Sequence, residues 1–124
     1  MKYVLFLSSI LYAGVVVAQT NNLPSSHTTA DAVYCSSKGL SFLDLGGRSK
    51  LGLLECQANL LTNLSLVGCQ QLKKVDCHEN RLVELNLADT ETTELFCGRN
   101  SLTNLILPNR GTIRRLFCGY NHLS

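Results

Sequence analysis

The sequence carries little net charge and no concentration of charge of one sign. Its 11 lysines and arginines and 9 aspartates and glutamates give a formal net charge of +2 over 124 residues, and no basic block or acidic tail stands out. The sequence therefore offers no electrostatic case for binding nucleic acid or an anionic membrane surface. The length excludes more than one small domain, while an apolar content of 45% is enough to bury a core.

Long apolar runs are confined to the N-terminus. Lys2 precedes apolar residues 3–17, and small side chains lie at the end of that run. This pattern is typical of a secretory signal peptide over residues 1–18, cleaved after Ala18. An uncleaved membrane anchor is the alternative, but two serines interrupt a run already shorter than the ~20 apolar residues of a spanning helix. No cysteine lies at the cleavage site, so a lipid anchor is not expected, and no membrane span is expected after cleavage.

Behind the predicted signal, the chain changes to a short polar segment and then to a repeat. Residues 19–29 are polar and turn-prone and are interpreted as a linker. Residues 30–124 form one self-similar domain, whose units start near residues 30, 51, 72, 92 and 113. The cysteines that mark the period are spaced by 21, 21, 20 and 21 residues, at Cys35, Cys56, Cys77, Cys97 and Cys118.

The shared pattern of these units, LxxLxCxxNxLxxLxL plus a turn, resembles the leucine-rich repeat. It is similar to the bacterial 21-residue form with cysteine at one leucine position, as in internalin J-like proteins. The resemblance covers residues 30–124. It implies a mainly β repeat solenoid of about four and a half coils, with parallel strands on a concave face and short strand or irregular segments on the convex side. It also implies that the concave face binds other proteins.

Side-chain alternation predicts the same architecture independently of that resemblance. Val75 and Cys77 are two residues apart and point to one side of a strand, while Asp76 and His78 point to the other. One such strand cannot bury its apolar side, but stacked coils place strand beside strand at ~4.8 Å and make one continuous core. Residues 82–87 repeat the apolar spacing and are expected to form the opposite wall.

Two ladders of polar or weakly polar residues are expected inside the solenoid. Asparagines follow each strand from the second unit onward, where an amide can satisfy backbone groups of its own and the neighbouring coil, at Asn59, Asn80, Asn100 and Asn121. The five-cysteine ladder is interpreted as buried free thiols. A disulfide is disfavoured because ~4.8 Å between neighbouring strands exceeds the usual Cβ separation, and zinc because the ligands stand in a line. Cys69 lies off the ladder, either exposed and reactive or tucked in.

The outward strand positions provide the candidate binding surface. Exposed aromatics mixed with arginine are typical of binding hot spots, and Gly98 and Gly119 are expected to clear space around the rings. The alternative is that the two phenylalanines only stack on each other or are covered by a further coil. The residues assigned to this surface are Phe96, Phe117, Tyr120, Arg99, Arg115, Tyr34, Glu55, Asp76 and His78.

An acidic group lies on the same predicted face. Glu55 and Asp76 are neighbouring positions, with His78 and Glu79 adjacent, so a divalent cation or a basic partner could be held there, or an acid and base pair formed. The simpler interpretation is a solvated polar surface. An open strand face has no pocket to exclude water, and Cys77 faces inward. We therefore expect no enzymatic activity, no cofactor and no metal.

The two ends depart from the repeat. The first unit has Ala30 where the others are expected to carry leucine or isoleucine, and Lys38 where they have asparagine. The last unit has no second half and no polar cap, so its open edge invites end-to-end self-association. The leading hypothesis is a secreted, periplasmic or cell-surface leucine-rich repeat module that binds an unidentified protein. The alternative is the N-terminal fragment of a longer solenoid with a structural or assembly role.

Overall fold

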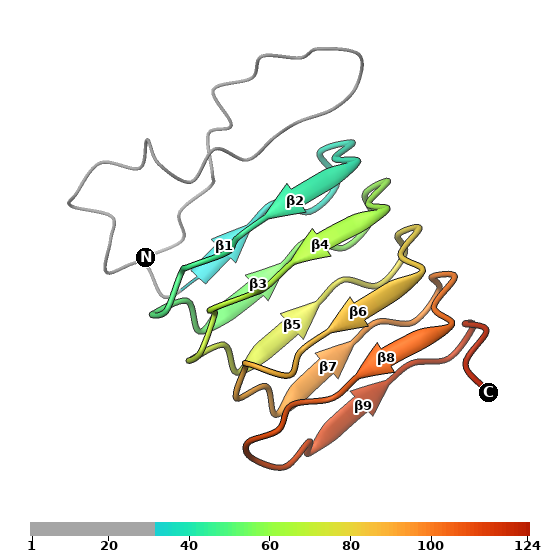
Figure 1. Cartoon of the computed structure of the whole chain (residues 1–124). Coiled ribbons are helices and arrows are strands. Elements are labelled where there is room, and N and C mark those ends of the chain that lie inside the picture. The colour runs from blue at the N-terminus through green and yellow to red at the C-terminus, as the bar shows by residue number, and fades with distance from the viewer. Residues whose placement is uncertain (1–31) are drawn as a thin grey trace.

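The computed structural model describes residues 32–124, which form a solenoid of parallel β-strands. Successive coils stack side by side along one axis (Figure 1). Each of the first four contributes one strand to each of two opposing walls, and the last described coil contributes β9 alone. The predicted signal peptide at 1–18, the linker at 19–29 and Ala30 lie outside the described residues. Within residues 32–124, no helix is long and apolar enough to cross a membrane. The predicted fold class, a mainly β repeat solenoid, is confirmed.

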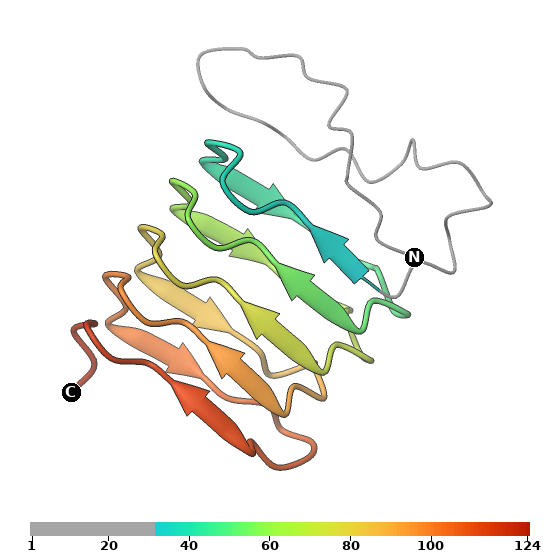
Figure 2. The same ribbon diagram turned by 180° about the vertical axis from the view of Figure 1, so that it is seen from behind.

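One wall is a five-stranded parallel sheet in the order β1-β3-β5-β7-β9. Equivalent positions of neighbouring coils are in direct register, so that Val75 on β5 lies between Leu54 and Leu95. The strands of this wall are β1 (Ala32–Tyr34), β3 (Leu53–Glu55), β5 (Lys74–Asp76), β7 (Glu94–Phe96) and β9 (Arg115–Phe117). Their outward surface is called the five-stranded face below; Figure 2 views the solenoid from that side.

The opposite wall is less continuous. It consists of two parallel two-stranded sheets, β2-β4 and β6-β8, with the hydrogen-bonded ladder interrupted between β4 and β6. The strands here are β2 (Phe42–Asp44), β4 (Asn63–Ser65), β6 (Glu84–Asn86) and β8 (Asn104–Ile106). The middle residue of β2, β4 and β6 is buried and that of β8 is partly buried, so this wall closes the core as the sequence predicts.

The core is a stack of leucine, valine and cysteine rows. Leu54, Val75 and Leu95 are completely buried, whereas Leu116 at the same position of the last described coil is 40% exposed. Each interior coil is covered on both sides by its neighbours, and the apolar surface of a coil is removed from water only by stacking. Burial therefore depends on position along the stack and not on the strand alone.

Asparagine side chains join each coil to the preceding coil. Asn80 Oδ1 accepts the N–H of Leu61 at 3.0 Å, and Asn80 Nδ2 donates to the carbonyls of Cys56 and Cys77, each at 3.0 Å. Cys56 belongs to the preceding coil and Cys77 to the asparagine's own coil. The same pattern recurs at Asn59, Asn100 and Asn121.

The residue before each ladder position has left-handed backbone geometry. Five non-glycine residues share this conformation, with φ of 55°, 54°, 54°, 52° and 57° at Ser37, Ala58, Glu79, Arg99 and Tyr120. A single non-glycine residue in this region costs on the order of 1 kcal/mol. At four of the five positions the following residue is an asparagine held by several hydrogen bonds, and after Ser37 the N–H of Lys38 donates to Asn59 Oδ1 at 2.8 Å. No glycine marks the position, so the sequence alone did not predict this conformation.

The shortened turn before β7 is closed by two buried threonines. Leucine or isoleucine was expected as the first residue of every unit after the first. The fourth unit begins with Thr92, so that expectation is wrong there. Thr92 Oγ1 donates to Leu72 O at 3.1 Å, and Thr90 Oγ1 donates to Leu87 O at 2.8 Å. The two hydroxyl oxygens are 2.9 Å apart. This turn is one residue shorter than its equivalents, and the hydroxyls donate to one carbonyl of the turn and to one of the preceding coil.

Replacing Asn80 by alanine is expected to destabilise the protein by about 3 kcal/mol. The carbonyls of Cys56 and Cys77 keep the amides of Asn59 and Asn100. The buried N–H of Leu61 has no other acceptor within residues 32–124, so it becomes unsatisfied. Urea denaturation of the purified chain under reducing conditions measures the loss.

Asn63→Ala is the matched control for this substitution. Asn63 is exposed on β4 and has no side-chain hydrogen bond in the described part of the chain. Its replacement should change the free energy of unfolding by less than about 0.5 kcal/mol. Equal losses in the two variants would mean that the asparagine ladder does not hold the coils together.

Candidate functional site

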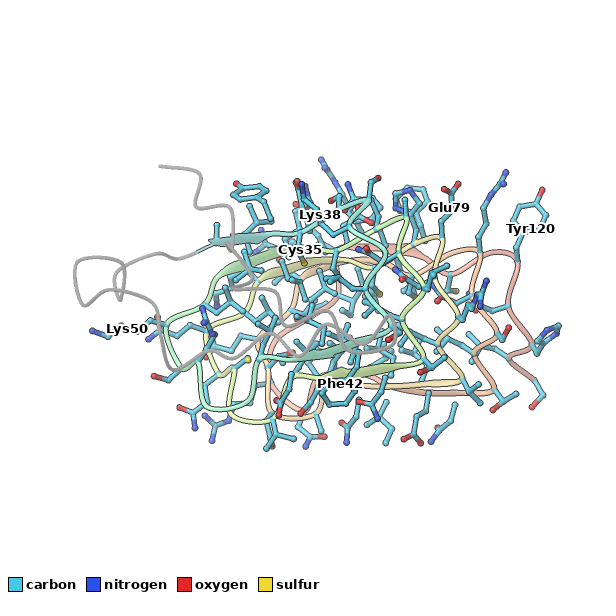
Figure 3. The ribbon with its side chains drawn as sticks, turned by 90° about the horizontal axis from the view of Figure 1, so that it is seen from above. Cys35, Lys38, Phe42, Lys50, Glu79 and Tyr120 are labelled. Atoms are coloured by element: carbon cyan, nitrogen blue, oxygen red, sulfur yellow. The ribbon has the colours of Figure 1, made fainter. Side chains whose placement is uncertain are left out.

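The five-stranded face is the candidate site because it combines exposed aromatic and charged side chains on a hydrogen-bonded sheet. Glu79 and Tyr120 project from this side of the solenoid, and Phe42 projects from the other (Figure 3). Neighbouring strands fix the outward side chains at ~4.8 Å intervals. The side chains therefore form rows that run across the coils.

An aromatic pair lies at the C-terminal end of the central row. Phe96 and Phe117 occupy directly paired positions on β7 and β9, and their rings stack with centroids 5.2 Å apart and an interplanar angle of 6°. The Nζ atom of Lys74 lies 5.7 Å from the centroid of the Phe96 ring. Phe96 is half-buried, while Phe117 is 59% exposed. The phenylalanines stack on each other, as one interpretation of the sequence held, and still leave one ring available to a partner.

The predicted arginines flank this pair and already have intramolecular partners. The guanidinium carbon of Arg99 lies 5.4 Å from the centroid of the Tyr120 ring, and its Nη1 lies 3.9 Å from Oε1 of Glu79. Nη1 of Arg115 lies 3.7 Å from Oε2 of Glu94. Exposed ion pairs of this kind contribute little stability. In the structure, these contacts place the guanidinium groups of Arg99 and Arg115 beside carboxylates of the neighbouring coil.

Three of the residues with left-handed backbone geometry form the outer edge of this group of side chains. Glu79, Arg99 and Tyr120 all have positive φ and directly precede ladder asparagines. Their side chains consequently follow one another along the stack, with an ion pair between the first two and a cation–π contact between the last two. We call Phe96, Phe117, Arg99 and Tyr120 the aromatic–arginine cluster.

The predicted acidic group forms pairs and does not converge. The carboxylate of Glu55 lies 3.7 Å from Nζ of Lys74, and Oδ1 of Asp76 lies 2.5 Å from Nδ1 of His78. In residues 32–124, no three His, Cys, Asp or Glu side chains are grouped so that they could hold a metal ion. Tyr34 is on β1, three strands and thus about 14 Å from Phe96, so it does not join the aromatic–arginine cluster.

Of the two glycines beside the cluster, only Gly98 has a backbone atom so close that a larger residue would be crowded. A Cβ atom at Gly98 would lie 3.1 Å from the backbone oxygen of Gly119, whereas a Cβ at Gly119 would meet nothing within 4 Å. The sequence interpretation gave both glycines the role of clearing space around the rings. For Gly98 the structure indicates a different constraint, the close approach of the next coil's backbone.

The cysteine ladder is internal and unreactive by environment. All six cysteines are free, and every one except Cys118, which is partly exposed, is buried. Burial raises the pKa of Cys35 and of Cys97 to about 12. It also raises the pKa of Cys56 and of Cys77 well above the usual value. Such thiols stay protonated at neutral pH and are poor nucleophiles.

Cys69, left open between exposed and buried by the sequence, is buried. Its Sγ donates a hydrogen bond to Leu45 O at 3.1 Å. Burial raises the pKa of the Cys69 thiol, opposed by a backbone hydrogen bond from Arg48. Cys69 is therefore part of the turn packing between two coils. Thr90 takes the equivalent position in the next coil and likewise donates to a backbone carbonyl.

Comparison of the chain with known protein families, with curated proteins and with solved structures gives no match. The functional argument therefore rests on the geometry of the five-stranded face.

Raising the pH above about 9 is expected to destabilise the fold through its buried thiols. Unfolded cysteines ionise near their ordinary pKa, while a ladder thiol such as Cys77 stays protonated because burial raises its pKa. Each buried thiol makes its full contribution to the free energy of unfolding below about pH 9. This contribution is lost as the pH rises toward the folded pKa, and the loss between pH 8 and pH 10 is about 1 kcal/mol for each thiol. Urea denaturation at the two pH values measures this loss. Cys77→Ala should reduce the pH dependence by one thiol's share, and an unchanged pH dependence in that variant would contradict the explanation.

Gly98→Ala and Gly119→Ala should distinguish the effect of a backbone clash in the folded state from the effect of removing a flexible glycine from the unfolded chain. Gly98→Ala forces a contact with the backbone of Gly119 and should destabilise the protein by about 1–2 kcal/mol. Gly119→Ala meets open space and should be neutral or stabilise by up to about 1 kcal/mol, because it reduces the entropy of the unfolded chain. Thermal unfolding of both variants compares them directly, and equal effects would disprove the role assigned to Gly98.

Proposed function

We propose that this protein is a leucine-rich-repeat-type module that binds another protein through its five-stranded face. We further propose that it is exported, through the signal peptide inferred over residues 1–18, and acts in the periplasm, at the cell surface or outside the cell. The observation that carries the proposal is the exposed aromatic–arginine cluster on a hydrogen-bonded sheet. Tyrosine and arginine are enriched where protein interfaces concentrate their binding energy.

Preorganisation supports this assignment over an incidental surface patch. The Phe96 ring holds Phe117 in a stack, and Arg99 is held between Glu79 and Tyr120. Binding of a partner then costs less side-chain entropy, because these side chains already have preferred positions. The cluster offers a flat apolar ring with guanidinium groups beside it. A partner with an apolar anchor residue and neighbouring hydrogen-bond acceptors fits this chemistry.

A catalytic role has weaker support on the same face. The Asp76–His78 pair is the best acid and base candidate, but it lies on an open sheet surface. The cysteine between these two residues points into the core, and burial keeps its thiol protonated. Within residues 32–124, the cysteine beside the pair is turned away from it, and we therefore propose a binding function without chemistry.

Site-directed photocrosslinking with matched positions on the two walls tests the proposal. A photoreactive amino acid replaces Tyr120 on the five-stranded face or, as the control, Val83 on the opposite side; both side chains are exposed in the structure. We expect crosslinks to a defined partner from position 120 and none to that partner from position 83. Crosslinking from position 83 alone, or equally from both, would contradict binding through the five-stranded face.

Affinity measurements on the captured partner then identify the residues responsible. Phe117→Ala and Arg99→Ala should each weaken binding by roughly 10-fold to 30-fold if they form the hot spot. Val83→Ser should leave the dissociation constant unchanged. Both sets of variants must keep the strand-rich circular dichroism spectrum of the parent. If the cluster variants bind the partner with unchanged affinity, the aromatic–arginine cluster is not the binding site.

A further inference from the structure

The wall opposite the five-stranded face is divided between the second coil, which carries β3 and β4, and the third coil, which carries β5 and β6. β4 and β6 are neighbours in the stack (Figure 1), yet in residues 32–124 they are the one adjacent pair of that wall without strand pairing. The pairs on either side, β2 with β4 and β6 with β8, are in full register. We call the boundary between residues 62–71 and residues 83–91 the far-wall seam.

Backbone hydrogen bonds that join the other coils on this wall are absent at the far-wall seam. The N–H of Leu45 donates to Ser65 O at 3.0 Å across the boundary before it. The N–H of Leu87 donates to Ile106 O at 2.9 Å across the boundary after it. Leu66 occupies the equivalent position at the seam, and within the described residues its N–H has no hydrogen-bond partner. Leu66 is buried, and an unpaired buried donor is rare in a folded chain.

The turns on the two sides of the seam follow different backbone paths. Gly47 and Gly68 turn the first two coils, both with φ of 81°, and a Cβ atom at Gly68 would lie 3.3 Å from the Cα atom of Gly47. These two turns therefore stack closely on each other. Asp89 is the equivalent residue of the third coil, and it does not have positive φ; its turn is one residue shorter and is closed by Thr90. The strand ladder is thus interrupted where the turn geometry changes.

The five-stranded face stays continuous across the same boundary. β3 pairs with β5 in full register, and the N–H of Cys56 donates to Asp76 O at 2.8 Å. On the other wall, Leu64 and Leu85 are buried in the core, but no hydrogen bond in residues 32–124 joins the segments that border the seam. The second and third coils are therefore hydrogen-bonded along the face, while apolar packing alone closes the far-wall seam.

We propose that the far-wall seam is a hinge. The first two coils move as one block and the following coils as another, and the paired strands β3 and β5 bend between them. Opening here exposes apolar side chains but breaks no backbone hydrogen bond of that wall, whereas opening at the boundary before or after it would also break a strand ladder.

The hinge controls the shape of the five-stranded face. When the seam opens, the far wall lengthens while the face keeps its strand spacing, so the face becomes more concave. The ion pair between Glu55 and Lys74 crosses the hinge on that face and lies on the inner side of the bend. This motion requires no bound partner, and it adds an adjustable curvature to a surface whose strands are otherwise fixed in register.

Amide hydrogen exchange of the full chain, followed by NMR under reducing conditions, gives the first test. The N–H of Leu66 should exchange faster than the amides of Leu45 and Leu87, by on the order of tenfold or more, because opening of the seam exposes it without breaking a hydrogen bond. Equal protection of the three amides would overturn the hinge.

A covalent lock distinguishes a seam that opens from an unpaired amide in a static wall. Asn63→Cys and Glu84→Cys place two thiols on exposed positions across the seam, where a bifunctional alkylating reagent joins them by thioether bonds. The matched control joins Glu84→Cys to Asn104→Cys across the paired strands β6 and β8. Both pairs are made with Cys118→Ser, because the other five cysteines are buried and react poorly.

The lock across the seam should slow exchange at Leu66 by on the order of tenfold or more relative to the same chain before crosslinking. The control lock should leave that exchange rate within about twofold. Unchanged exchange at Leu66 in the seam-locked chain would contradict a moving hinge. Equal slowing by both locks would mean that the coils open together, which overturns a hinge at this boundary. Exchange is measured without a partner, so failure of the hinge is distinct from failure of the proposed binding function.

Discussion

The asparagine amide between coils is the constraint on which the rest of this structure depends. A strand ladder alone can pair neighbouring coils, but each coil must also turn inward after three strand residues and bury its turn. At that turn an inward N–H and two inward carbonyls lie away from water. One side chain, such as that of Asn80, satisfies all three. A buried polar group without such a partner would cost more than the net stability that the strand bond provides.

Two other features follow from this contact. The residue before each ladder position adopts positive φ, and the structure accepts that strain at Ala58 and Glu79 without using glycine. The residue three positions before it contributes a carbonyl that two amides share, as Cys77 does with Asn80 and Asn100. A small side chain fits under this crowded carbonyl. Cysteine therefore functions as packing, and its raised pKa is a consequence of that position.

Repetition made the fold predictable, while individual contacts were not. The period fixed the strand positions, the inward rows and the opposite wall, because register in stacked coils leaves little freedom. The left-handed residue and the Thr90–Thr92 pair escaped prediction because each depends on a local backbone path that no single residue type signals. The same holds for the role of Gly98. Its constraint comes from the backbone of the next coil and not from a neighbouring side chain.

The aromatic–arginine cluster was foreseen as a set of outward residues and the stacking of its phenylalanines as one alternative, but the contact of Arg99 with Tyr120 was not foreseen. Side-chain torsions decide that Phe96 and Phe117 stack in parallel and that Arg99 leans toward Tyr120, and the sequence gives only their strand positions. Tyr34 shows the limit of such reasoning. It shares the outward row with Phe96 yet lies three strands away, so a row alone does not define a site.

The position of the cluster couples binding to the stability of the last described coil. The Phe96–Phe117 stack, the Arg99–Tyr120 contact and the Glu94–Arg115 pair all cross the boundary between β7 and β9. In a solenoid each coil is stabilised only by its neighbours, so a coil covered on one side opens more readily than the interior. A partner that contacts both rings joins the last coil to the stack and gains affinity when that coil is already ordered.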